Sequence, residues 1–332
     1  MATAAPAAQP RSHRAATLAR REAITAYIFI APYLITAGIF TFGVLAYVFY
    51  TSFTNLTASF AADNAKFVGL ANYIRAFQDQ EFLISLANVF WYFVIVTTLQ
   101  TIGAILLAVL LNAKLRGMRI YRTMLYAPSV ASAVVMSLIF LWLYLRTGFI
   151  NYIFGTNISW LSSPRPILAP IYALFGVNVL ELPYFLRGPS ITWTAIMLMN
   201  VFSTIPTYMV MFLAALQDIP RHLYEAASLD GATGARAFWY ITLPLLRPVI
   251  ALVVILGTIG TFLVFAQISI MTQGGPLRST LAPLYLIYQK TLGAGTQAEA
   301  GFGAAMAFIL AAIIITINII QRRYIERSTE QY

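Results

Sequence analysis

The stretch QDIPRHLYEAASLDGATGARAFWYITLPLLRP, residues Gln217–Pro248, decides the fold because it is the longest non-apolar run in the second half of the chain. Long apolar segments flank it on both sides. Pro220 suits the first turn of a helix, which predicts a short helix over Arg221–Leu229. Gly231 follows where a chain leaving a helix often needs a positive φ. The pattern therefore predicts a compact helix–turn–helix at a membrane surface.

A second short helix is expected after this turn. Thr233 can cap it with its side-chain hydroxyl, and the helix would run through Phe238 and Trp239. Pro244 and Pro248 lack a backbone N–H, so we expect them to interrupt the backbone just before the next apolar run.

Composition places the chain in a membrane. Of its 332 residues 60% are hydrophobic and only 10% are charged, whereas a soluble domain carries about 25% charged residues. The mean hydropathy is +0.77. Cysteine is absent, which excludes disulfides and thiolate metal sites.

Six apolar runs are long enough to cross a hydrocarbon core of about 30 Å as helices. They cover residues 27–50, 84–111, 120–145, 191–216, 249–271 and 302–320. The first is longer than the core of a secretory signal, so an uncleaved helix is expected. A further apolar stretch, residues 167–186, contains two prolines, a glycine and Glu181, and we expect an external insertion rather than a span. The fold class is therefore an all-α polytopic membrane protein with six transmembrane helices.

Loop charges predict the orientation of these spans. Fourteen of the 21 Lys and Arg residues lie in the N-terminal segment, the loop before the third span, residues 217–248 and the C-terminal segment. Because cytoplasmic loops are enriched in Lys and Arg, both termini and the helix–turn–helix are expected inside the cell. Residues 1–24 are predicted to be a disordered basic tail, and residues 324–332 a second cytoplasmic tail. Membrane topology thus explains the net charge of +10, and we expect no nucleic acid as a partner.

The central stretch also carries a family resemblance. EAASLDGA at Glu225–Ala232, followed by ITLPLLRP at Ile241–Pro248, resembles the cytoplasmic "EAA" loop of ABC-importer permeases. Other segments fit the same family, and the resemblance runs from about Thr25 to Arg323. Those segments are FVGLANYIRAF (Phe67–Phe77), YRTMLYAPSV (Tyr121–Val130), GFINYIFG (Gly148–Gly155), FLAALQDIP (Phe212–Pro220) and MTQGGP (Met271–Pro276). The chain is most similar to the first permease subunit of carbohydrate importers of the maltose and glycerol-phosphate type.

The resemblance implies a type I importer permease fold, a transport role rather than an enzyme, and residence in a bacterial or archaeal plasma membrane. It implies three kinds of partner besides the lipid bilayer: a second permease subunit, a cytoplasmic ATPase present in two copies, and an extracytoplasmic substrate-binding protein. The sequence contains no P-loop, so ATP and Mg are expected on the ATPase subunits and no cofactor on this chain.

The resemblance also assigns the coupling of ATPase to pore to residues of the EAA loop, residues 217–248. In this assignment Glu225 is a charged anchor, Ala226 and Ala227 keep the contact surface narrow, Gly231 sets the turn and Pro244 fixes the exit into the fifth span. The full set of expected coupling residues is Glu225, Ala226, Ala227, Asp230, Gly231, Ile241, Leu243 and Pro244.

A substrate path is expected inside the spans, where polar side chains should face the bundle interior. Pro206 lies within the fourth span, and broken helices often mark binding sites in transporters. The alternative interpretation is helix–helix contact through small polar residues, with ordinary aromatic packing. The candidates are Asn200, Ser203, Thr204, Tyr208, Phe262, Phe265 and Gln267.

The expected function is ATP-driven import of a sugar, an oligosaccharide or related carbohydrate, by alternating access. An ion-coupled secondary transporter and an importer of glycerol phosphate or a polyol stay open as alternatives, and the motif disfavours a non-transporting scaffold. None of the eleven acidic residues lies deep in a predicted span, which disfavours ion coupling. His13 and His222 lie outside the spans and far apart in sequence, so no metal site is expected.

Overall fold

The computed structural model describes residues 13–57, 65–112, 117–293 and 298–327. Within these ranges the chain is helical, and extended pairing is limited to two isolated bridges, Thr54 with Phe67 and Pro166 with Ser190. Five helical stretches and one bent helix pair are long and apolar enough to cross a membrane. They are Arg20–Thr51, Gln80–Leu111, Met118–Val130 with Ala133–Leu143, Ile191–Asp218, Arg247–Met271 and Ala300–Tyr324. With the bent pair counted as one span, the number of candidate spans agrees with the predicted six.

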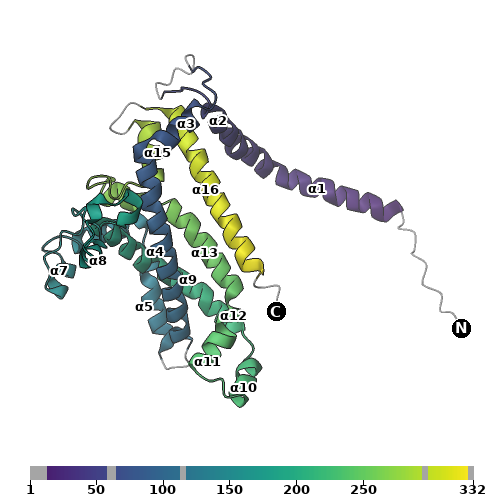
Figure 1. The fold of residues 1–332 in the computed structure, drawn as a ribbon. Coiled ribbons are helices and arrows are strands. Elements are labelled where there is room, and N and C mark those ends of the chain that lie inside the picture. Colours follow the sequence, from purple (N-terminus) through teal and green to yellow (C-terminus); the bar gives the residue numbers. More distant parts are fainter. Residues whose placement is uncertain (1–12, 58–64, 113–116, 294–297, 328–332) are drawn as a thin grey trace.

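Helices α4 (Gln80–Leu111) and α9 (Ile191–Asp218) form the centre of the bundle. Both begin at side-chain caps: Asp79 accepts from the backbone N–H of Phe82 at 2.9 Å, and Ser190 from that of Trp193 at 3.0 Å. Helix α13 (Arg247–Phe262) packs on α4, and α16 (Ala300–Arg327) packs on the other side of α13 (Figure 1). The Tyr92 and Trp193 rings, both fully buried, meet at 4.7 Å in the main core.

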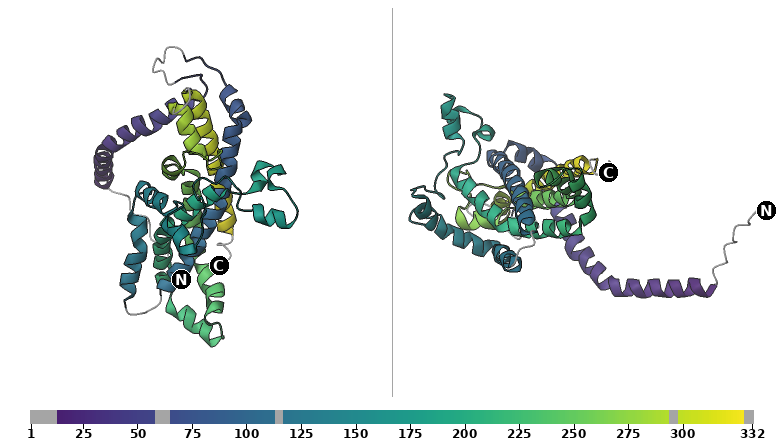
Figure 2. Two further views of the ribbon diagram at one scale, coloured as in Figure 1. Left: turned by 90° about the vertical axis from the view of Figure 1, so that its left-hand side faces the viewer. Right: turned by 90° about the horizontal axis from the view of Figure 1, so that it is seen from below.

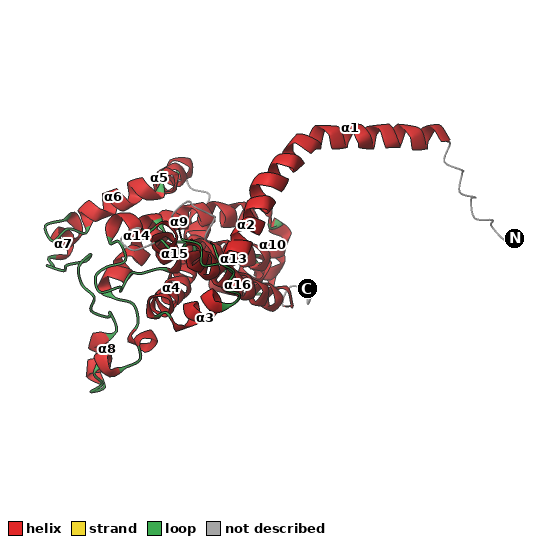
Figure 3. Cartoon of the chain, turned by 90° about the horizontal axis from the view of Figure 1, so that it is seen from above, coloured by secondary structure: helices red, strands yellow, loops and turns green. Residues whose placement is uncertain are grey.

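Most of the first span stands away from this bundle, and only its C-terminal end contacts α16 (Figures 1 and 3). It comprises α1 (His13–Ala37), the π-helical segment η1 (Gly38–Gly43) and α2 (Val44–Thr51). Its apolar window has no residue buried inside the chain, so lipid or another subunit has to cover it. Helix α1 begins within the segment predicted as a disordered tail. The correction has a simple cause: residues 13–31 contain no Pro or Gly to stop the helix. Residues 1–12 lie outside the described part.

The third span is not the continuous helix that residues 120–145 predict. Helices α5 (Met118–Val130) and α6 (Ala133–Leu143) meet at 95°. Pro128 removes a backbone donor in the last turn of α5, and the Ser132 hydroxyl accepts from Val135 N–H at 3.3 Å to start a new helix. The fifth span is also divided, since α13 ends at Phe262 and α14 (Ala266–Met271) begins after a three-residue break.

The two ends of the bundle differ in character. The EAA loop, with helices α10 (Arg221–Leu229) and α11 (Ala235–Ala237), lies at the same end as the C-terminus of α16 (Figures 1 and 2). At this end Arg122 donates from Nε and Nη2 to the Leu111 carbonyl, at 3.2 and 2.7 Å. A cation at that position satisfies a carbonyl left free by the end of α4. It thereby joins the second span to the third.

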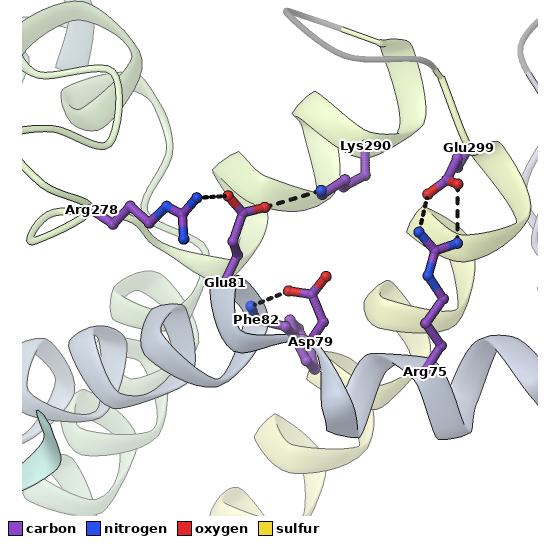
Figure 4. Close-up of polar contacts among 7 residues, drawn as sticks. All are labelled: Arg75, Asp79, Glu81, Phe82, Arg278, Lys290 and Glu299. Atoms are coloured by element: carbon purple, nitrogen blue, oxygen red, sulfur yellow. Dashed lines mark hydrogen bonds and ion pairs between the residues drawn. The ribbon is translucent and has the colours of Figure 1, made fainter. Parts of the chain in front are cut away.

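Ion pairs gather at the opposite end (Figure 4). Glu81 contacts Arg278 at 2.8 Å and Lys290 at 3.0 Å, whereas Arg75 pairs with Glu299 through two parallel hydrogen bonds of 3.0 and 2.9 Å. The Arg75 and Arg278 side chains are half exposed, so the pairs that these two arginines form add little stability. The pairs fix α3 (Ala71–Gln78) and the N-terminus of α4 against α15 (Pro283–Leu292) and the start of α16.

The insertion, residues 167–186, contains only short helices. They are α8 (Ala169–Leu174) and two 3-10 turns, Val179–Glu181 and Tyr184–Arg187. The segment projects from the bundle near α8 (Figure 3). Trp91 Nε1 donates to the Phe185 carbonyl at 2.8 Å, and the Tyr184 hydroxyl donates to Asn88 Oδ1 at 2.8 Å. These bonds attach the insertion to the side of α4 without a seventh span.

The turn around α7 (Phe149–Phe154) depends on one side chain. Asn151 is 2% exposed, and its amide nitrogen bonds the carbonyls of Leu145, Arg146 and Ile158. Its amide oxygen accepts from the Thr156 hydroxyl, Ile158 N–H and Trp160 Nε1. Every polar atom of this amide is therefore used to shape the loop between the third and fourth spans.

Candidate functional site: the EAA loop and the pore cavity

The first helix of the EAA loop, α10, covers Arg221–Leu229, the bounds that the sequence predicts. It ends at Asp230, and Gly231 follows with φ of +76°. Open space surrounds the position of a Cβ at Gly231, so its backbone angle rather than crowding demands glycine. The Ala232 N–H returns to the Ala227 carbonyl at 2.8 Å and closes the turn.

The helix presents one face outward. Glu225, Ala226 and Asp230 are exposed, and Leu229 is 89% exposed. Ala227 is only 9% exposed, so it packs toward its own chain. This placement differs from the expectation that both alanines narrow an outer surface. A helix face repeats every 3.6 residues, so adjacent residues point in different directions.

The inner face of α10 is attached to the segment that follows. The Tyr224 hydroxyl lies 2.9 Å from Thr242 Oγ1, on the π-helical segment η5 (Phe238–Thr242). Ile241, Leu243 and Pro244 are half-buried beside it. Displacement of α10 would therefore carry the start of the fifth span with it.

Two details of the second half of the loop differ from prediction. Thr233 does not cap the next helix: Gly234, with φ of +55°, stands at that position before α11 (Ala235–Ala237). Pro244 and Pro248 lie in the first turns of α12 (Leu243–Leu245) and α13. A helix needs no N–H from proline there, so both prolines start helical segments instead of interrupting them.

A cavity of about 200 Å³ lies at the bend between α5 and α6, beside α9 and α14. Four of the predicted path residues meet in it, although they come from two different spans. Thr204 Oγ1 also donates to Gln100 Oε1 on α4 at 2.9 Å. The residues lining this pore cavity are Ser129, Ala131, Ala133, Met136, Met199, Asn200, Ser203, Thr204, Thr207 and Gln267.

The structure places the other three predicted path residues elsewhere. Phe262 is 2% exposed and packs against Phe93 with ring centroids 5.5 Å apart. Phe265 contacts the rings of Tyr285 and Tyr288. Tyr208 packs on a second cluster of buried apolar residues, which lies between the C-terminal half of α4 and α9. Side-chain packing accounts for their positions, as the alternative interpretation states.

Sequence reasoning missed two polar groups of the pore cavity and one behind it. Ser129 and Thr207 line the cavity, and Gln100 lies behind Thr204 with an amide nitrogen that is buried and has no partner among the described residues. The serine directly after Pro128, with a second serine three positions later, was the available signal for the bend and for Ser129. Gln100 had a signal too, as an amide in the middle of an apolar run.

The described residues contain no group of three or more His, Asp or Glu side chains that could hold a metal ion. Charge is likewise absent from the lining of the pore cavity, which consists of hydroxyls, amides, methionines and alanines. Such a surface can form hydrogen bonds to a neutral polar solute.

The family of the "Binding-protein-dependent transport system inner membrane component" matches residues 91–330, which include the EAA loop and the lining of the pore cavity. The chain belongs to this family. It is therefore a multi-pass membrane protein, and the predicted ABC-importer permease fold is confirmed.

Relatives of this permease cover nearly its whole length. It is 32% identical to the sn-glycerol-3-phosphate transport system permease protein UgpA of Agrobacterium fabrum, over 92% of this chain and 95% of the relative. It is 29% identical to the arabinooligosaccharides transport system permease protein AraP of Halalkalibacterium halodurans, over 94% and 90%. It is also 29% identical to the lactose transport system permease protein LacF of Rhizobium radiobacter, over 92% and 95%.

Solved structures share the fold of the permease. A crystal structure of a bacterial ABC transporter involved in the import of the acidic polysaccharide alginate superposes with a TM-score of 0.74 at 18% identity. The match covers 95% of this chain and 99% of that chain. A second structure, of the bacterial alginate ABC transporter in complex with an alginate pentasaccharide-bound periplasmic protein, gives a TM-score of 0.73 at 19% identity.

Proposed function

We propose that the permease is one of two membrane subunits of an ATP-driven importer that moves a saccharide into the cytoplasm. The observation that carries this proposal is the direct connection between the EAA loop and the pore cavity. Helix α9 supplies Asn200, Ser203 and Thr204 to the cavity and ends at Asp218. Only Ile219 and Pro220 separate it from α10. Contrary to the expected break, α9 is continuous through Pro206, so one helix connects α10 to the cavity.

The mechanism follows from this connection. One of two copies of a cytoplasmic ATPase holds α10 in a groove, and closure of the ATPase pair around ATP and Mg shifts the permease toward an outward-open state. An external binding protein delivers the solute to that state, and hydrolysis resets it. The second permease supplies the other half of the pore, and this chain binds neither nucleotide nor metal itself.

A neutral saccharide is the substrate class that the pore cavity favours. Its lining offers hydroxyl and amide groups but no cation, and neutral hydroxyl groups need no counter-charge. The names of two relatives, arabinooligosaccharides and lactose permeases, support this class. A glycerol phosphate or polyol importer is the second candidate, because a relative named for sn-glycerol-3-phosphate is 32% identical.

Ion coupling fits the spans less well. In the described spans the acidic residues are Glu22, Glu81 and Asp218, and each lies in a terminal turn. A proton relay of Asp or Glu side chains would place carboxylates deep within the membrane. The permease instead carries an exposed helix, α10, whose attachment to the start of the fifth span suits coupling to a separate cytoplasmic ATPase.

Reconstitution tests the proposed function. The permease, its partner permease, the ATPase and the binding protein are combined in liposomes, and uptake of labelled lactose, arabinotriose and glycerol 3-phosphate is measured. Uptake should require both ATP inside and binding protein outside. Accumulation driven by a proton or sodium gradient without ATP would refute the proposal. Uptake of glycerol 3-phosphate alone would replace the saccharide with the second candidate.

Substitution of Asn200 by leucine should impair transport without unfolding the permease. The change keeps the side-chain size but removes an amide group from the lining of the pore cavity, and one lost bond to a substrate corresponds to about a tenfold loss of uptake at low substrate concentration. Initial uptake rates over a range of substrate concentrations measure the effect. Asn157→Leu, at an exposed loop position, is the control. Equal uptake by both variants would remove Asn200 from the path.

Single-cysteine labelling should place the EAA loop inside the cell. The permease has no cysteine, so Trp239→Cys, at a 62% exposed position, introduces one accessible thiol. A membrane-impermeant maleimide should label it in inside-out vesicles and leave it unlabelled in intact cells. Leu277→Cys, 84% exposed at the opposite end, should show the reverse pattern. Labelling of the Trp239→Cys variant in intact cells would overturn the orientation.

A further inference from the structure

A second cavity lies where the insertion meets the loop before α15. Its volume is about 560 Å³, within the range of about 300–1,000 Å³ typical of small-molecule sites. Ser190, the cap at the start of α9, is part of its wall. The cavity therefore lies at the end of α9 remote from the EAA loop. It shares no residue with the pore cavity. Its lining is Pro164, Arg165, Pro166, Ala169, Asn178, Val179, Leu180, Tyr184, Arg187, Gly188, Ser190, Leu277 and Ser279.

Two arginines in this lining have no acidic partner among the described residues. Arg165 is exposed and Arg187 is half-buried. Arg187 donates from Nε to the Leu182 carbonyl at 2.9 Å, which orients its guanidinium and leaves the terminal nitrogens without an acceptor in the described part of the chain. Glu181, the carboxylate within the insertion, accepts from the Asn178 amide at 2.9 Å instead. The Arg187 guanidinium also lies over the Tyr184 ring, 6.0 Å from its centroid, and neither arginine pairs with a carboxylate of the described residues.

A buried hydroxyl in the same wall also lacks a partner. Ser279 is 7% exposed, and no described group bonds its Oγ. A buried polar group without a hydrogen bond is costly, and a ligand in the cavity would supply the missing acceptor. Its neighbour Tyr184 is already committed, since its hydroxyl donates to Asn88. Burial raises the pKa of the Tyr184 phenol, which outweighs the lowering by the Asn88 hydrogen bond and the charge of Arg187.

We propose that this cavity binds the carboxylate or phosphate group of an acidic saccharide. Arginine guanidinium groups recognise these planar or multidentate anions through paired N–H donors, and the Ser279 hydroxyl adds a third donor. The remaining wall, with Pro164, Pro166 and Val179, is apolar and suits the C–H face of a sugar ring. The site is distinct from the pore cavity, so the inference stands or falls independently of the transport proposal.

Calorimetric titration of the full chain tests the site in the absence of the ATPase and the binding protein. The permease is placed in phosphatidylcholine nanodiscs and titrated with D-glucuronate, glucose 6-phosphate and D-glucose. At least one acidic probe should bind about tenfold more tightly than glucose, since charge-assisted bonds are the stronger ones. Arg165→Gln, at an exposed position, should remove most of this preference. Arg146→Gln, an equal charge change at an exposed position outside the cavity, should retain it.

Ser279→Ala separates a ligand contact from a structural role. It should weaken binding of the acidic probe about threefold or more, while the thermal midpoint of the empty protein stays the same or rises because an unbonded hydroxyl is removed. Equal affinity for glucose and both acidic probes, or equal losses in Arg165→Gln and Arg146→Gln, would overturn the proposal. Competition by phosphatidylglycerol in the nanodiscs, with loss of saccharide binding, would assign the site to a lipid headgroup and overturn the saccharide.

Discussion

Reversal of the charge at Glu225 should abolish ATP-driven uptake while leaving the permease folded in the membrane. Glu225 is exposed on α10, and the proposed function makes it the carboxylate that meets a basic groove of the ATPase. Placing a lysine there turns attraction into like-charge repulsion, which costs several kcal/mol across an interface. Uptake in Glu225→Lys should therefore fall at least about tenfold. Surface substitutions of this kind change folding stability by about 0.5 kcal/mol or less.

Glu22→Lys provides the matched control, because it makes the same charge change at an exposed residue of α1 that is predicted to lie on the same side of the membrane. Uptake and co-purification of the ATPase are measured for both variants at equal membrane abundance. Loss of ATPase co-purification in Glu225→Lys alone would support the docking role. Normal uptake by a well-expressed Glu225→Lys variant would exclude it.

Asn151→Asp should destabilise the permease more than any surface change. The side chain keeps its shape, but an oxygen replaces the amide nitrogen that bonds the carbonyls of Leu145, Arg146 and Ile158. Three acceptors then face a buried carboxylate. Loss of such bonds and burial of an uncompensated charge together cost about 3 kcal/mol or more. The thermal midpoint in detergent should fall clearly, with disorder of the loop between the third and fourth spans.

Asn157→Asp is the control, since it makes the same chemical change six residues away at an exposed position of the same loop. Its thermal midpoint should match that of the unaltered protein. Lowering the pH should partly rescue Asn151→Asp, because protonation of the carboxyl removes the charge and restores one donor. A variant as stable as its control would show that the six bonds of Asn151 are dispensable.

Helix existence could be predicted from the sequence, whereas helix continuity could not. The six apolar runs depend on local composition, and the bounds of α10 depend on Pro220 and Gly231. Both features can be read directly from the sequence. The bend at Ala131–Ser132 interrupts a run that is apolar enough to read as one helix. The bend forms instead of a straight helix because Ser132 caps α6 and because α5 packs against α9 while α6 packs against α14.

Site residues divide in the same way. Asn200 and Gln267 were predicted as path residues because they are polar groups in apolar runs, and the structure brings them into one cavity. Phe262 looked equally suitable by type, yet it is buried against Phe93 of another span. Which face of a helix meets the core depends on the helices that pack against it, and a single sequence does not show which helices those are. The cavity at the insertion has the same origin, because Arg165 and Ser279 are more than one hundred residues apart.

The detached first span bears on how the subunit melts and assembles. Elements that share no interior with the rest cannot unfold cooperatively with it, so the unit that melts as one begins near Thr51, whose side chain is the first in this span to be buried. The helix before it behaves thermodynamically as a membrane anchor hinged to that unit at its end, where Phe49 meets Phe308 at 5.0 Å. This helix can therefore pack against lipid or another subunit after the other five spans have folded together.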